Sequence, residues 1–276
     1  MNLIDTHCHI QSIGLNRGET STRSLWAKSP ELSVSSVLDG ARAVGVNQMI
    51  CVGCDLEDSV LAVDFAANHA GCYASIGLHP HEADKYKDQS AKLSTFSELV
   101  AHPKVIAVGE CGLDYFYNHS TKENQIAVLK FQIGLAQSFN LPIVFHVREA
   151  YDDFWPILES YSNIRGVLHS FTDSAENLQR GIDNGLYIGV NGIATFTNKP
   201  EQLAMYKAIP LERLVLETDA PFLAPAPLRG KICEPKYIKQ TAQFLSTLRN
   251  QDLQAIAQAT TDNARALFKL DNPLTS

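Results

Sequence analysis

Two histidines separated by a single residue, His7 and His9, stand at the end of the first apolar run, in the segment IDTHCHI. On a strand, residues two apart point to the same side of the sheet. Imidazoles placed in this way are frequent metal ligands, although a pair taken alone is equally well explained by ordinary hydrogen-bonded side chains. The pair therefore predicts a metal site only if further ligands accompany it.

Further side chains that can bind metal ions follow other apolar runs. Glu110 follows VIAVG, and Asp219 closes the run RLVLET. A carboxylate placed directly after a buried strand is costly unless its charge is compensated, and a bound cation would compensate it. Imidazole and carboxylate together suit Zn, Mn, Co or Fe, and a carboxylate-rich subset suits Mg. The full candidate set exceeds one tetrahedral site and predicts two ions held by His7, His9, Glu110, His146, His169 and Asp219.

The apolar runs predict eight strands, with helical patterns between them. Most runs are continuously apolar, as is typical of parallel strands buried on both faces. A capping box at Ser120 and Glu123 predicts a long helix ending near Asn140. Two terminal helices are expected at 235–248 and 252–268. The predicted strands are 2–6, 48–52, 73–77, 105–109, 142–145, 166–168, 186–190 and 213–216.

Eight such units in 276 residues predict an α/β protein with a (β/α)8 TIM-barrel fold, as a single domain over residues 1–276. A doubly wound open sheet is the alternative. In a barrel the carboxyl ends of the strands meet at one mouth, so the candidate ligands are expected to converge there. The polar, Gly- and Ser-containing stretch at about 11–30 predicts an extended loop after the first strand.

The composition limits the classes of function. The chain is 45% hydrophobic and 19% charged, with a net charge of −7, which argues against a basic nucleic-acid coat protein. An acidic enzyme can still act on phosphates when a bound metal supplies positive charge. Six dispersed cysteines predict reduced thiols rather than a disulfide framework. Without an apolar stretch of 18 residues or a signal-peptide pattern, we expect a cytoplasmic protein with no membrane association.

Several motifs together resemble the TatD-type metal-dependent deoxyribonucleases. They are DTHCH at Asp5, GLHPH at Gly77, GECGLDY at Gly109 and ETDAP at Glu217, followed by the RGK loop at Arg229. The resemblance covers nearly the whole chain and implies a TIM barrel with a divalent-metal centre. It implies that His7, His9 and Asp219 hold one ion, that His146 and His169 hold another, and that Glu110 bridges them. Family members are described as Mg-dependent nucleases, often 3′–5′ exonucleases on single strands.

The expected reaction is hydrolysis of a phosphodiester with two divalent ions, Mg, Mn or Zn, as cofactors. Asp219 is expected to orient the attacking water and take its proton, while Glu110 holds the ions. Further side chains are candidates for contacts with a nucleic-acid substrate, most simply single-stranded DNA, although structural or solvated roles explain each of them equally well. These are His79, Tyr115, Arg229 and Lys231.

Two other classes of function remain open on the sequence. A metal-dependent amidohydrolase or esterase would use the same ligands to polarise a carbonyl group, and some relatives in the resembled family are linked to removal of D-amino acids from tRNA, as a D-aminoacyl-tRNA deacylase would do. A binding protein with a structural metal is the other alternative. No obligate protein partner is indicated by the sequence.

Overall fold

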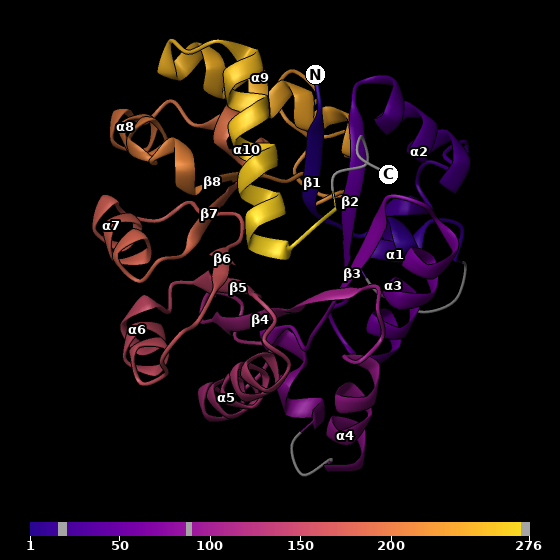
Figure 1. Cartoon of the computed structure of the whole chain (residues 1–276), viewed down its shortest axis with the longest axis vertical. Coiled ribbons are helices and arrows are strands. Elements are labelled where there is room, and N and C mark those ends of the chain that lie inside the picture. Colours follow the sequence, from indigo (N-terminus) through magenta and orange to yellow (C-terminus); the bar gives the residue numbers. More distant parts are fainter. Residues whose placement is uncertain (16–20, 87–89, 272–276) are drawn as a thin grey trace. The chain divides into compact units, whose positions relative to one another are not determined.

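The computed structural model describes residues 1–15, 21–86 and 90–271. In this part of the chain, strands and helices alternate, and the eight strands follow one another in the sheet in their sequence order, β1 to β8 (Figure 1). This order is that of a (β/α)8 TIM barrel, whereas a doubly wound sheet reverses its strand order at a switch point. The predicted fold class is therefore confirmed.

The chain falls into two compact units. The first comprises Met1–Ile50, Ser170–Ile182 and Tyr187–Ser276, and the second comprises Cys51–His169 and Asp183–Leu186. β2 (Val46–Val52) and α7 (Ala175–Asp183) each cross from one unit into the other along the chain.

The first unit contains the two ends of the described chain. Its further strands are β1 (Leu3–Cys8), β7 (Tyr187–Val190) and β8 (Leu214–Leu216), with β7 parallel to β8 from Ile188 opposite Leu214. Its helices are α1 (Ser21–Trp26), α2 (Val34–Ala43), α8 (Pro200–Ala208), α9 (Ile238–Arg249) and α10 (Leu253–Phe268), with 3₁₀ turns at Ile10–Ser12, Gly192–Phe196, Leu211–Arg213 and Pro235–Tyr237.

The second unit is built on four consecutive parallel strands. They are β3 (Cys72–Ile76), β4 (Val105–Asp114), β5 (Ile143–Arg148) and β6 (Gly166–Leu168). Its helices are α3 (Leu56–Asn68), α4 (Ser90–Leu99), α5 (Lys122–Phe139) and α6 (Tyr151–Glu159), with a 3₁₀ segment at Pro80–Tyr86. The apolar parts of these strands are mostly buried, which agrees with their continuous apolar sequences, while β5 ends with the exposed Arg148.

All eight predicted strands are present, but several ends differ from the prediction. β4 continues beyond Gly109 to Asp114, and β5 continues beyond Phe145 to Arg148. The residues at these ends include polar ones, yet β4 and β5 still pair with each other there. A search for apolar runs therefore ends both strands too early. Both extensions matter for function because they carry Glu110 and His146 inside strands.

Two predictions about local structure are wrong. Part of the predicted loop at 11–30 is helical, since α1 spans Ser21–Trp26. Trp26 holds this helix in place: its side chain is buried, and its indole N–H donates to the backbone oxygen of His9, 3.0 Å away. Residues 16–20 of that stretch lie outside the described residues. The cap of α5 is Thr121, whose hydroxyl accepts from the Asn124 N–H, whereas the hydroxyl of Ser120 donates to the backbone oxygen of His81.

The close approach of β4 to β5 depends on glycine. Gly112 pairs with His146, has φ +157°, and a Cβ built on it would lie 1.8 Å from the His146 backbone oxygen. Gly112 lies two residues after Glu110 on β4, so its pairing with His146 brings the backbone of His146 close to the part of β4 that carries Glu110. A side chain at position 112 would force the two strands apart.

We therefore expect Gly112→Ala to destabilise the protein by about 2–4 kcal/mol, through backbone strain and steric overlap. Urea unfolding of full-length protein would measure the change. Gly134→Ala is the matched control, because Gly134 lies within α5 and a Cβ built on it would meet no atom within 4 Å outside its own helix backbone. That control is expected to be neutral or more stable by up to ~1 kcal/mol. Equal stability of Gly112→Ala and wild type would contradict the pairing.

Candidate metal-binding clusters

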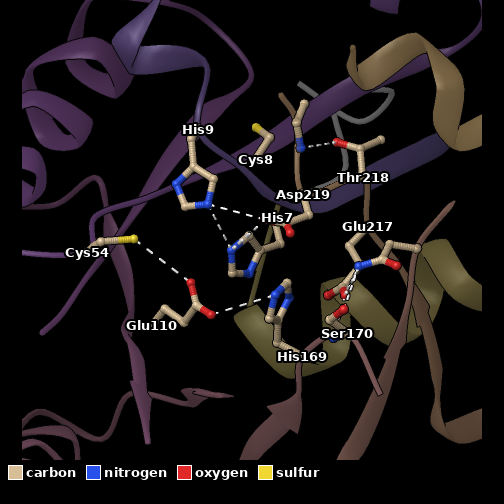
Figure 2. Close-up of polar contacts among 12 residues, drawn as sticks. His7, Cys8, His9, Cys54, Glu110, His169, Ser170, Glu217, Thr218 and Asp219 are labelled. Carbon is tan, nitrogen blue, oxygen red and sulfur yellow. Dashed lines mark hydrogen bonds and ion pairs between the residues drawn. The ribbon is translucent and has the colours of Figure 1, made fainter. Parts of the chain in front are cut away.

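A first cluster of metal-ligand side chains lies in the first unit and comprises His7, His9 and Asp219, here called the β1 cluster (Figure 2). The Nε2 atoms of His7 and His9 are 3.3 Å apart. Asp219 Oδ1 lies 3.3 Å from His9 Nε2 and 3.7 Å from His7 Nε2. Both imidazoles are buried, while the Asp219 side chain is 15% exposed. The three donor atoms thus surround one point with a side open to water.

Backbone pairing between the end of β1 and the segment after β8 brings these side chains together. The Asp219 N–H donates to the His7 backbone oxygen, and the His9 N–H donates to that of Ala220, each over 2.8 Å. Cys8 and Ala220 form an isolated parallel bridge between the same segments. β1 ends at Cys8, and His7 and His9 on either side of Cys8 point to one side, with their Nε2 atoms 3.3 Å apart, as the sequence predicted.

A buried carboxylate, that of Asp5, holds the segment that leads to Asp219. Asp5 accepts from the Thr218 N–H at 2.9 Å and from the Thr218 hydroxyl at 2.5 Å. Burial raises the pKa of Asp5 to about 7, although the hydrogen bonds from Thr218 oppose that shift. Asp5 and Thr218 were not assigned roles from the sequence, because their contact depends on residues 213 positions apart.

A second cluster lies in the second unit and comprises His79, Glu110, His146 and His169, here called the β4–β5 cluster. Glu110 Oε1 lies 2.8 Å from His146 Nδ1 and 3.7 Å from the Nε2 atoms of both His79 and His169. The Cys54 sulfur lies 3.9 Å from Glu110 Oε2. Figure 2 shows Glu110 between Cys54 and His169. One buried carboxylate is therefore surrounded by three imidazoles.

Asp114 adds a buried carboxylate beside this cluster. Its Oδ2 lies 3.1 Å from the Nε2 atoms of both His81 and His146. Burial raises the pKa of Asp114, but hydrogen bonds from His146 and His81 outweigh burial and hold that pKa well below its usual range. The sequence predicted the end of this strand at Gly109, whereas Asp114 ends β4. Its position four residues after Glu110 on one strand is the signal that could have assigned it to the same side.

Charge compensation decides the protonation of the imidazoles. Burial lowers the pKa of His146, yet the hydrogen bonds to Asp114 and Glu110 outweigh burial and raise that pKa to about 9. For His79, burial dominates, the positive charge of His146 adds to it, and the pKa falls well below its usual value. The two carboxylates thus favour a proton on His146, and a bound cation would compete with that proton.

The donor atoms fit divalent metal ions. Ligand nitrogen and oxygen atoms at 2.0–2.1 Å from a tetrahedral ion are separated by about 3.3–3.4 Å. Two of the three distances in the β1 cluster, both 3.3 Å, match that separation, and the third, from His7 Nε2 to Asp219 Oδ1, is longer at 3.7 Å. In the second unit, donor atoms of His79, Glu110 and His146 lie within 4.8 Å of one another. Imidazole and carboxylate donors are typical of Zn, Mn or Fe sites.

The remaining candidates for substrate contacts have other surroundings. The Tyr115 hydroxyl donates to Asp153 over 2.8 Å, and the Lys122 ammonium lies 3.9 Å from the Tyr115 ring centroid. In the first unit, the Arg229 guanidinium lies 4.8 Å from the ring of Phe196, and both Arg229 and Lys231 are exposed. Their predicted contacts with substrate stay predictions.

Glu217 is a buried carboxylate of the first unit that accepts hydrogen bonds from neighbouring groups. It accepts from the Ser170 N–H over 2.6 Å, and the Asn191 side-chain amide lies 3.4 Å from the same oxygen. Figure 2 shows the contact between Glu217 and Ser170. The carboxylate is thus engaged with backbone and amide groups.

Comparison with known families shows to which family the chain belongs. The model of the TatD related DNase family matches residues 4–269. The chain belongs to the TatD family. Membership extends over the whole fold and includes the residues of both clusters, so the chain is a metal-dependent hydrolase.

Similar proteins cover most or nearly all of this TatD-family chain. An uncharacterized metal-dependent hydrolase, YabD of Bacillus subtilis, is 35% identical over 98% of this chain and 100% of its own length. A 3′-5′ ssDNA/RNA exonuclease, TatD of Klebsiella pneumoniae, is 36% identical over 85% of this chain and 91% of its own. The crystal structure of YJJV, a TatD homologue of Escherichia coli, covers 98% of each chain with 29% identity and a TM-score of 0.84. In the described part of the chain, the helices fall short of the length and apolar character needed to cross a membrane.

Proposed function

We propose that this TatD-family hydrolase is a deoxyribonuclease that shortens single-stranded DNA from its 3′ end with the help of divalent metal ions. The observation that carries the proposal is the pair of largely buried clusters in which histidines lie 2.8–3.7 Å from a carboxylate. A relative with 36% identity that is named a 3′-5′ ssDNA/RNA exonuclease supports the choice of substrate. Cytoplasmic location and the lack of an obligate protein partner stay predictions.

The chemistry of the donors suggests how the side chains would share the work. His7, His9 and Asp219 would hold one ion, and His146 and His169 would hold another, with Glu110 as the expected bridge. When bound, such ions supply positive charge and Lewis acidity for attack of water on phosphorus. Asp219 is the carboxylate of its cluster and is partly open to solvent, which suits it to orient the water and take its proton.

His79 is suited to a different part of the reaction. Its depressed pKa keeps the imidazole neutral, so one ring nitrogen carries a hydrogen that can be donated to a phosphate oxygen. It adds no charge to a site whose positive charge is supplied by the ions. Arg229 and Lys231 are exposed cations of the first unit and suit contact with a further phosphate.

Metal removal tests the cofactor part of the proposal. We expect dialysis against a chelator to abolish hydrolysis and addition of Mg, Mn or Zn to restore it, with two ions per chain by elemental analysis. Asp219→Ala is expected to retain one ion, because it alters only the β1 cluster. A chelated protein that keeps full activity, or a wild type that binds no ion, would contradict the assignment.

Comparison of substrates tests the reaction. The same metal-loaded protein is given labelled single-stranded DNA, the corresponding duplex and a D-aminoacyl-tRNA, and the values of kcat/KM are compared. The proposal expects single-stranded DNA to be preferred by at least about tenfold over the other two. Preference for the aminoacyl ester would establish the alternative, a deacylase that uses the same ligands on a carbonyl carbon.

A further inference from the structure

Two aromatic side chains after β4, those of Phe116 and Tyr117, are unusually open to solvent. Their exposed fractions are 48% and 51%, higher than those of the other exposed large hydrophobic residues in the described chain. The next is Phe139 at 41%. Adjacent exposed aromatic residues are costly in water and commonly mark a binding surface.

Cationic and aromatic groups gather around this pair. The rings of Phe116 and Tyr117 have centroids 4.8 Å apart, and the Arg148 guanidinium lies 4.1 Å from the first ring and 4.9 Å from the second. The exposed His119 lies 5.8 Å from the Tyr117 ring and nearly parallel to it. Phe116, Tyr117, His119 and Arg148 are here called the aromatic platform.

One carboxylate joins the platform to the β4–β5 cluster. Asp114 Oδ1 accepts from the backbone N–H groups of Phe116 and Tyr117, each over 3.0 Å, while its Oδ2 contacts His81 and His146 at 3.1 Å. Asp114 thus holds the turn that carries the two aromatic rings and also contacts His146, a candidate metal ligand. A molecule seated on the platform would lie next to that ligand.

We propose that the aromatic platform stacks a base of a single-stranded nucleic acid whose phosphodiester is held at the β4–β5 cluster. The inference rests on the proposed nuclease function and names a binding subsite for it. Every base offers a π-face, and exposed aromatic rings with an adjacent arginine are the groups that bind single strands without reading sequence. The guanidinium also supplies positive charge for the backbone phosphates in a protein of net charge −7.

The platform begins directly after Tyr115, which the sequence suggested for contact with substrate. The Tyr115 hydroxyl is hydrogen-bonded to Asp153, and its side chain is less exposed than those of Phe116 and Tyr117. Its two neighbours along the chain instead present their rings to solvent. Because stacking reads a π-face and not a base edge, the subsite is expected to accept all four bases and both DNA and RNA.

The test compares binding of two oligonucleotides that differ only in having bases. Full-length protein in the presence of a chelator, which prevents hydrolysis, is titrated with a fluorescein-labelled dT8 and with an abasic strand of the same length. Wild type is expected to bind dT8 about tenfold more tightly. Phe116→Ala/Tyr117→Ala is expected to lose that preference while its affinity for the abasic strand is unchanged. Phe139→Ala, an equally large exposed ring on α5, is the matched control and is expected to keep the preference.

The outcomes separate this inference from the nuclease proposal. A wild type that cleaves and binds dT8 but does not prefer it over the abasic strand would overturn the platform alone, as would a double variant that keeps the preference. A wild type that neither binds nor cleaves any oligonucleotide would overturn the proposed function and the platform with it. Circular dichroism of the double variant checks that it is folded, which is expected because both side chains are exposed.

Discussion

Glu110→Gln is expected to lower metal-dependent hydrolysis by at least about a hundredfold. Glu110 is the carboxylate that His79, His146 and His169 surround. An amide of the same shape keeps the packing but removes the negative charge that would hold a cation. Loss of groups that merely orient metal ligands already costs roughly 10–100-fold in affinity or activity, so loss of a central ligand should cost more.

Two measurements separate this effect from damage to the fold. Calorimetric titration of the chelated variant with Mn is expected to show weaker binding, while circular dichroism is unchanged. Glu98→Gln is the matched control, because Glu98 is an exposed glutamate of α4. Wild-type rates and wild-type metal affinity in Glu110→Gln would remove Glu110 from the site.

Asp219→Asn is expected to lower kcat by about 10²–10⁴, the range found for loss of a general base, with a smaller change in KM. Its carboxylate contacts both histidines of the β1 cluster and is the one group of that cluster that is partly open to solvent. The backbone at Asp219 has φ +58°, a conformation that asparagine tolerates well, so the variant should fold normally.

The control for this variant is Asp39→Asn, an aspartate of α2 whose side chain is 73% exposed. It should leave the rate unchanged. The pH profile adds a readout that a structural role would not affect. If Asp219 takes the proton from water, the acid limb of the wild-type rate profile should be lost in Asp219→Asn. A variant with the wild-type limb would assign the proton transfer to another group.

Much of the fold could be predicted from the sequence, for a physical reason. Strands buried on both faces are continuously apolar, so runs such as 142–145 and 166–168 stand out without any partner. The histidines and carboxylates of both clusters stand at or just after the ends of such apolar runs. Backbone hydrogen bonds then bring His7 next to Asp219, and strand pairing sets Gly112 opposite His146.

What the sequence did not predict depends on contacts between distant residues. Asp114 belongs to β4 because that strand keeps pairing with β5 past its apolar part, with Asp114 opposite Arg148. The short helix α1 is held in place by the buried side chain of Trp26, and its sequence has no apolar periodicity that would predict a helix. The Phe116 ring faces solvent because the turn after β4 is fixed by the hydrogen bond from the Phe116 N–H to Asp114.

Hydrolysis of 5′-labelled single-stranded DNA by metal-stripped protein, with Mg, Mn or Zn added one at a time beside Glu110→Gln, tests the central claim most directly. The account predicts a ladder of products shortened from the 3′ end with wild type and added metal, and intact strand with the chelator or with the variant. Intact strand with every metal, from a wild-type protein that binds two ions, would contradict the nuclease assignment.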